Sequence, residues 1–266
     1  MKKQVIFITG TSSGLGKAMA ELCYENGHIV YGSSRNPPAE NPYFEELKVD
    51  VTDQQSVQNA INYIIEKEGR IDVVINNAGL GIIGPIEYLD VADVNRVWQT
   101  NVNGLLHVLQ AVLPSMRHHN AGKIISISSI ASVIALPFRG VYCASKAAGD
   151  KIIQSLRMEL SQTNISCCSI QAGDIKTSIN ENRLKVKDLE DPFYADIVKR
   201  TNQHIDEEVN KGMSAQAVAL EIYHLLSHEK LPITYVVGKP LQKLSLWIKR
   251  IVSESIFEKI IASYSK

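Results

Sequence analysis

A glycine-rich turn near the start of the chain constrains its fold more than any other feature. The turn is Thr9-Gly10-Thr11-Ser12-Ser13-Gly14-Leu15-Gly16; it follows an apolar run at residues 5–8 and precedes apolar side chains at helical spacing. A strand, a tight turn and a helix in this order predict the start of a parallel βαβ unit. Gly10 permits a sharp exit from the strand, Gly14 lets a ligand approach the backbone, and Gly16 lets the helix pack closely on the sheet. The amide groups at the start of that helix predict a site for a pyrophosphate.

Strand-like and helix-like segments alternate along most of the chain. Six further apolar runs predict strands at residues 28–34, 44–49, 71–75, 123–129, 165–170 and 233–237. A long helical pattern covers residues 90–119, and Pro114 is expected to kink it near its end. The alternation predicts an α/β fold with a Rossmann-type, doubly wound parallel sheet of seven strands in a single domain. We expect residues 1–240 to form this domain, with an excursion at residues 175–212, and residues 241–266 to form an amphipathic helical tail.

The balance of charges, the spacing of the histidines and the cysteine pattern argue against several classes of function. Lysine plus arginine and aspartate plus glutamate number 28 each, which argues against nucleic-acid binding. His224 and His228 are four residues apart, but no nearby glutamate or cysteine completes a metal site, so no metal is expected. No stretch is long and apolar enough to cross a membrane, and we expect a cytoplasmic protein. The cysteines lack C-x-x-C spacing and predict reduced thiols: Cys23, Cys143, Cys167 and Cys168.

A tyrosine and a lysine four residues apart form the candidate catalytic pair. Tyr142 and Lys146 share one face of a predicted helix, and Ser129 ends the strand before it. A tyrosine hydroxyl has an ordinary pKa of about 10, which is too high for efficient acid–base catalysis at neutral pH. A neighbouring ammonium group favours the phenolate, so Lys146 is expected to lower the pKa of Tyr142.

Taken together, these motifs resemble the short-chain dehydrogenase/reductase family along nearly the whole chain. The motifs that carry the resemblance, in chain order, are the glycine turn, Asp50, Asn76-Asn77-Ala78-Gly79, Asn101, Gly104, Ile127-Ser128-Ser129, Tyr142 to Lys146, and Gly173 to Thr177. Residues 35–37, 81–85 and 137–143 are most similar to the branch of 17β-hydroxysteroid and retinol dehydrogenases. Ala172 stands where the family usually has a proline, which removes one fixed backbone angle from the following loop.

The resemblance implies an oxidoreductase that interconverts a ketone and a secondary alcohol by hydride transfer. It implies that Tyr142 is the general acid or base and that Ser129 holds the substrate oxygen. Lys146 is expected to bind the ribose of the nicotinamide as well, and Asn101 to hold a water that links Lys146 to solvent. A catalytically silent sensor or scaffold that binds NADP(H) is the alternative, and the intact set of four residues argues against it.

The residues after the second predicted strand favour NADP(H) as the cofactor. NAD-dependent relatives place an acidic side chain there, whereas this chain has Ser33-Ser34-Arg35. A guanidinium suits a 2′-phosphate, although Arg35 could also be a solvated loop residue. The resemblance assigns the following residues to the cofactor: Gly10, Thr11, Ser12, Ser13, Gly14, Leu15, Gly16, Arg35, Asp50, Val51, Asn77, Ala78, Gly79, Tyr142, Lys146, Gly173, Ile175 and Thr177.

The remaining segments bear on the substrate and on partners. In the family, the region at residues 177–212 closes over a small-molecule substrate, and residues 81–85 and 133–136 are expected to supply mostly apolar walls. A lipophilic carbonyl compound is therefore favoured. The tail repeats apolar residues at helical spacing, with lysines and an arginine between them, which fits packing on its own domain, on a partner subunit or on a membrane surface. The resemblance also implies a homodimer or homotetramer, formed through the helices at 90–119 and around Tyr142.

Overall fold

The strongest apolar runs form one parallel sheet. The computed structural model describes residues 2–177, 183–186 and 189–263. Its main sheet has the order β11-β7-β6-β4-β1-β2-β3, all neighbours pair in parallel, and the order reverses beside β1. The strands are β1 (Val5–Thr9), β2 (Ile29–Ser34), β3 (Glu45–Lys48), β4 (Val73–Asn76), β6 (Gly122–Ser129), β7 (Ile165–Ala172) and β11 (Thr234–Val237). The expected seven-stranded, doubly wound sheet is thus confirmed.

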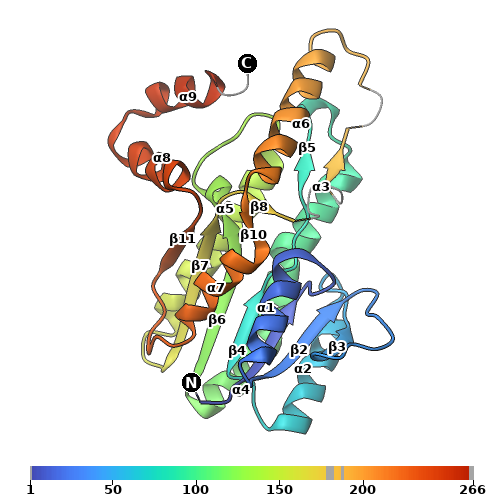
Figure 1. Ribbon diagram of the computed structural model, residues 1–266, viewed down its shortest axis with the longest axis vertical. Coiled ribbons are helices and arrows are strands. Elements are labelled where there is room, and N and C mark those ends of the chain that lie inside the picture. Colours follow the sequence, from blue (N-terminus) through green and yellow to red (C-terminus); the bar gives the residue numbers. More distant parts are fainter. Residues whose placement is uncertain (1, 178–182, 187–188, 264–266) are drawn as a thin grey trace.

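Helices cover both faces of the sheet (Figure 1). Apolar side chains of α1 (Gly14–Glu25) and α7 (Ala215–Leu225) form one buried cluster with one face. Those of α2 (Gln54–Glu68), α4 (Gly104–His119) and α5 (Gly140–Glu159) form a second cluster with the other face. None of the helices in the described part of the chain is both long and apolar enough to cross a membrane.

The helical pattern at residues 90–119 is interrupted, but not at the proline. It forms α3 (Val91–Trp98), a π-helical turn η2 (Gln99–Asn103) and α4, and Pro114 lies inside α4, which continues to His119. The turn holds Asn101, whose side chain bonds to Leu80 and Ser145 from two other segments. These tertiary hydrogen bonds accompany the irregular turn, a kind of bulge that is frequent at functional sites.

Smaller elements lie around the carboxyl ends of the strands (Figure 1). Two short parallel pairs join segments that are distant in sequence, β5 (Ile82–Ile83) with β9 (Leu184–Lys185) and β8 (Ile175–Lys176) with β10 (Met213–Ser214). The others are η1 (Ile86–Tyr88), η3 (Ile130–Ser132), α6 (Ala195–Asn210), α8 (Pro240–Ile251) and α9 (Glu254–Ser263). The tail is therefore two helices rather than one, and residues 178–182, 187–188 and 264–266 of the expected excursion and tail lie outside the described residues.

Candidate active site

A cavity of about 920 Å³ opens at the carboxyl edge of the sheet, where the motifs converge. Tyr142, Lys146 and Ser129 line it. So do most residues expected at the cofactor: Gly10, Ser12, Ser13, Gly14, Leu15, Arg35, Asp50, Val51, Asn77, Ala78, Gly79, Gly173, Ile175 and Thr177. Thr11 and Gly16 are absent from its lining. The Thr11 hydroxyl instead donates to Glu46 Oε1 at 3.1 Å, and a Cβ on Gly16 would collide with the carbonyl oxygen of Gly10.

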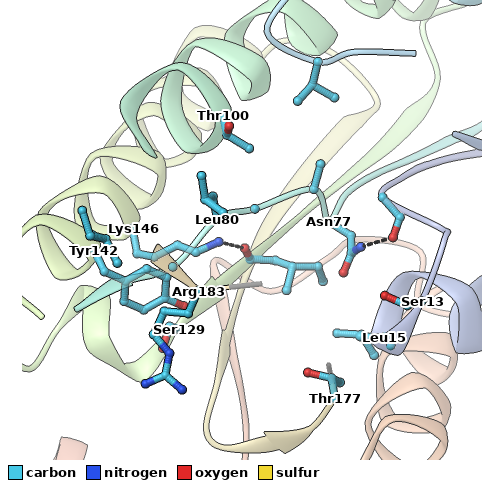
Figure 2. A pocket seen from close by; sticks show the side chains of 18 of the residues that line it. Ser13, Leu15, Asn77, Leu80, Thr100, Ser129, Tyr142, Lys146, Thr177 and Arg183 are labelled. Carbon is cyan, nitrogen blue, oxygen red and sulfur yellow. Dashed lines mark hydrogen bonds between the residues drawn. The ribbon is translucent and has the colours of Figure 1, made fainter. Parts of the chain in front are cut away.

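The glycine turn has the backbone geometry that its sequence predicts. Gly10 has a φ of +74° and Gly14 a φ of +60°, a left-handed conformation that favours glycine. Asn77 fixes the turn from the neighbouring strand, because its side-chain amide donates to the carbonyls of Thr9 at 2.9 Å and Gly10 at 3.0 Å (Figure 2). Helix α1 begins at Gly14, so its first amides lie at the cavity. An anion bound there would meet the positive end of the helix dipole.

The end of the cavity beyond β2 is lined by polar groups. Ser33, Ser34, Arg35 and Asp50 line this end. Ser34 Oγ is buried and has no hydrogen-bond partner among the residues that the structure describes. One carboxylate oxygen of Asp50 accepts from the amide of Thr52 at 2.9 Å and from its hydroxyl at 2.8 Å. A buried hydroxyl that lacks a partner fits a site whose ligand supplies polar atoms.

Tyr142 and Ser129 meet at the other end of the cavity. Both side chains line the cavity, and Figure 2 shows them beside Lys146. The Tyr142 side chain is half-buried, and protein atoms surround its hydroxyl closely. This burial raises the pKa of the hydroxyl, whereas Ser129 and the positive charge of Arg139 lower it. The expected lowering of the Tyr142 pKa by Lys146 is therefore absent in this state, because burial outweighs the groups that favour the phenolate.

Lys146 points toward the sheet. Its ammonium donates to the carbonyl oxygen of Ile127 at 2.9 Å and lies 6.0 Å from the centroid of the Tyr142 ring (Figure 2). Burial lowers the pKa of Lys146 to about 8, and the negative charge of Asp150 opposes this effect. Lys146 is thus a cation at neutral pH that loses its proton more readily than an exposed lysine.

A second, small cavity of about 20 Å³ lies behind Lys146 and also contacts Asn101. Both amide hydrogens of Asn101 have acceptors, the carbonyl oxygen of Leu80 at 2.9 Å and Ser145 Oγ at 2.9 Å. Three other atoms at this cavity are buried without a partner among the described residues: Asn76 Oδ1, Asn76 Nδ2 and Ser128 Oγ. A polar cavity needs about 10–15 Å³ to hold a water, so this one is large enough.

The residues that line the substrate end of the large cavity are only partly those expected from the sequence. Gly81 and Ile82 line it, but residues 83–85 and 133–136 do not. Ile134 instead packs against Leu246 and Phe257 of the tail. Leu80 and Arg96 also line the cavity and lie outside the segments that the sequence indicated, whereas Arg139, Asp174, Ile205 and Val209 lie within them. Ile205 and Val209 are four residues apart on α6, so they share one face of that helix.

Comparisons with known proteins agree with this geometry. A family model described as short chain dehydrogenase matches residues 4–188. The 3-ketodihydrosphingosine reductase of Bacteroides thetaiotaomicron is 39% identical over 246 residues, 92% of this chain and 91% of that protein. The NADPH-dependent 3-dehydrocapnine reductase of Ornithobacterium rhinotracheale is 31% identical over 87% of each chain. A short-chain dehydrogenase from Streptomyces avermitilis superposes with a TM-score of 0.84 at 26% identity, covering 97% of each chain.

The fold, the cavity and the matches therefore lead to one assignment. The matched region contains the glycine turn, Ser129, Tyr142 and Lys146, which all reach the same cavity. Because the family model spans more than half of the chain and a relative above 30% identity spans most of it, the family is established. This protein belongs to the short-chain dehydrogenase/reductase family and is an oxidoreductase that acts on a small molecule with a nicotinamide cofactor.

Proposed function

We propose that this protein is an NADPH-dependent reductase that converts a ketone on a lipophilic substrate into a secondary alcohol. The observation that carries the proposal is that Tyr142, Ser129 and Lys146 line one cavity, which continues to the glycine turn. The names of the two relatives both place a keto group at carbon 3, and one of them is NADPH-dependent. We therefore propose a 3-keto group on a long-chain molecule as the reacting centre.

The side chains at the cavity supply the proton for such a reduction. When bound, the nicotinamide supplies a hydride to the carbonyl carbon. Tyr142 gives its hydroxyl proton to the carbonyl oxygen, and Ser129 donates a hydrogen bond to that oxygen. Because burial raises the pKa of Tyr142, its hydroxyl keeps the proton at neutral pH, which suits reduction. Lys146 supplies a positive charge beside the tyrosine and donors for the ribose hydroxyls.

We propose that a water in the small cavity returns protons to Lys146. Both amide hydrogens of Asn101 have acceptors, so a water held by Asn101 must donate to one of its oxygen atoms. The polar atoms of Asn76 and Ser128 that lack partners can complete the hydrogen bonds of that water. This arrangement supports the role expected for Asn101 as the link between Lys146 and solvent.

The reductase activity can be tested with a panel of ketones. We expect the purified protein to oxidise NADPH in the presence of long-chain 3-keto compounds, and to act at least tenfold less efficiently on short ketones and on sugars, because the apolar wall at Ile82, Ile205 and Val209 binds the chain. Absorbance of NADPH gives kcat/KM for each compound. Equal efficiency across chain lengths would contradict a lipophilic substrate, and NADPH binding without turnover of any ketone would favour the silent sensor.

We propose that NADPH is preferred through Arg35. Its guanidinium lies at the polar end of the cavity, beside the buried Ser34 hydroxyl. We expect Arg35→Asp to raise the KM for NADPH by about 10- to 100-fold, the loss of one charged hydrogen bond, and to affect NADH far less. Steady-state kinetics with both cofactors measures the difference, and Arg200→Asp, at an exposed position of α6, is the matched control. Equal losses for NADPH and NADH would refute the assignment.

We propose that the protein is cytoplasmic and forms a homodimer or homotetramer through α4 and α5. Its four cysteines are free and buried, which suits a reducing compartment. On α5, Met158 is 71% exposed. An apolar side chain of this length at the surface of a long helix fits a contact with a second copy.

We also propose that the tail contacts membrane surfaces, where a long-chain substrate would be found. Helices α8 and α9 bury Leu246 and Phe257 against the domain, which supports packing of the tail on its own subunit. The same helices leave apolar side chains at least 46% exposed in a stripe: Leu241, Leu244, Trp247, Ile251 and Ile256. Lys243 and Arg250 are exposed on α8, so the stripe has basic neighbours that anionic lipids attract.

Vesicle flotation tests the membrane contact. We expect the full-length protein to float with phosphatidylcholine vesicles that contain phosphatidylglycerol, and the Trp247→Ser/Ile251→Ser variant to stay unbound, because it loses two exposed apolar anchors. The control is Lys243→Gln/Arg250→Gln, which should lose only the dependence on phosphatidylglycerol. If the unchanged protein does not float, the tail packs on its own domain or on a partner subunit.

A further inference from the structure

Two arginines from distant parts of the chain reach the substrate end of the cavity. Arg139 immediately precedes α5 and lies three residues before Tyr142. Arg183 comes from the other wall, where its Cγ would be 3.3 Å from a Cβ placed on Gly81. Figure 2 shows Arg183 beside Tyr142 and Ser129. The catalytic hydroxyl therefore has basic side chains on two sides.

The Arg183 side chain and one donor atom of Arg139 are buried, which is unusual for charged residues. The Arg183 side chain is 6% exposed, and its guanidinium forms an ion pair with Asp206 at 3.0 Å. Asp206 is shared, because Lys185 lies 4.0 Å from its other oxygen. The Nε atom of Arg139 is buried and has no hydrogen-bond partner among the described residues. A buried donor without an acceptor destabilises a protein, so an acceptor from a ligand would be strongly favoured.

Among the charged residues that line this part of the cavity, basic side chains outnumber acidic ones. Asp174 also lines the cavity, but one of its oxygens accepts from Gln242 at 2.6 Å. Arg96 lines the cavity as well and pairs with Asp93 at 3.0 Å. Lys146 adds a further cation beside Tyr142. Asp174 lines the cavity together with Arg139, Arg183 and Lys146, whereas Asp206 and Asp150 offset part of the charge of Arg183 and Lys146 from outside the lining.

We propose that Arg139 and Arg183 bind an anionic group of the substrate, a carboxylate, sulfonate or phosphate a short distance from the keto group. The inference rests on the proposed reductase function and deepens it. Guanidinium groups bind such oxyanions through paired, charge-assisted hydrogen bonds. The apolar side chains of Leu80, Ile82 and Ile205 then contact the hydrocarbon chain. A substrate whose only charge is an ammonium group would meet like charges and bind poorly.

Three ketones with the same chain and keto position test the proposal: a 3-keto carboxylate, the corresponding 3-keto sulfonate and the neutral methyl ester. We expect kcat/KM with NADPH to be at least about tenfold higher for one or both anions than for the ester, which is the size of effect of one charged hydrogen bond. The comparison of carboxylate with sulfonate identifies the favoured group. Arg139→Gln and Arg183→Gln should each remove this selectivity for the anion, and Arg139→Lys should keep part of it.

The matched control is Lys185→Gln, which removes a positive charge near Asp206 without touching the cavity, and it should keep the selectivity. Binding of an alkyl sulfonate and of the alcohol of the same length, measured by calorimetry, gives a second readout for each variant and is independent of turnover. The proposal is overturned if the ester is used as well as both anions, or if selectivity survives both glutamine variants. Selective binding of the alkyl sulfonate without reduction of any ketone would instead overturn the proposed reductase function and leave the anion site standing.

Discussion

Replacement of Tyr142 by phenylalanine is expected to lower kcat by a factor of about 10² to 10⁴ and to leave NADPH affinity close to that of the unchanged protein. Phenylalanine keeps the ring and its packing and removes only the hydroxyl at the cavity. The carbonyl oxygen then loses its proton donor, whereas the cavity near the glycine turn is unaltered. Steady-state rates with a long-chain 3-keto compound measure the loss, and fluorescence titration with NADPH measures cofactor binding.

A second tyrosine provides the control for this substitution. Tyr223 lies on α7, where its hydroxyl bonds to His28 at 3.2 Å, outside the cavity. Tyr223→Phe should therefore change stability slightly and leave kcat unaltered. If Tyr142→Phe retains full turnover, the proton comes from another group. If turnover is lost but the biological activity of the protein persists, the catalytically silent NADP(H)-binding sensor becomes the better description.

The parts of this protein that the sequence predicts correctly are those set by local pattern. Apolar runs of strand length and a glycine turn between strand and helix depend on neighbouring residues, so the seven strands and the positive φ values of Gly10 and Gly14 follow from the sequence. The order of the motifs also places Tyr142 and Lys146 at the edge where parallel strands end.

The features that the sequence does not predict depend on contacts between distant segments. Residues 133–136 are apolar, and an apolar segment can line a pocket or be covered by another helix. In the structure the tail covers Ile134. Nothing local distinguishes the π-helical turn at Gln99–Asn103, which accompanies bonds from Asn101 to Leu80 and Ser145. The raised pKa of Tyr142 is not predicted by the local pattern either, because burial is a property of the assembled fold.

Replacement of Lys146 by methionine is expected to decrease turnover at least about 100-fold and yet to stabilise the folded protein at neutral pH. The activity falls because the cation beside Tyr142 and the donors for the ribose are both removed. The stability rises because burial lowers the pKa of Lys146 from an ordinary 10.5 to about 8. A lowered pKa means that the folded protein holds this proton less tightly than the unfolded chain does.

The two pKa values of Lys146, 10.5 in the unfolded chain and about 8 in the folded protein, fix how its contribution to stability changes with pH. Below about pH 8 both states carry the proton, and the charge destabilises the folded protein by about 3 kcal/mol. As the pH rises from about 8 to 10.5, the folded state loses the proton first, so this penalty disappears and the contribution to the free energy of unfolding increases. Above that range both states are neutral and the contribution is constant. Methionine has the length of the lysine stem but lacks the charge, so the variant has none of this dependence.

Urea unfolding of both proteins between pH 7 and pH 10.5 tests this prediction. After about 1 kcal/mol is subtracted for the lost hydrogen bond to the carbonyl of Ile127, Lys146→Met should be more stable by about 2 kcal/mol at pH 7. As the pH rises toward 10.5 this gain should disappear and reverse, which leaves the variant less stable by up to about 1 kcal/mol. Lys151→Met, at an exposed position of the same helix, should show neither effect. A variant that is less stable than the unchanged protein at pH 7 would show that the surroundings of Lys146 stabilise its charge. The charged lysine would then not destabilise the folded protein.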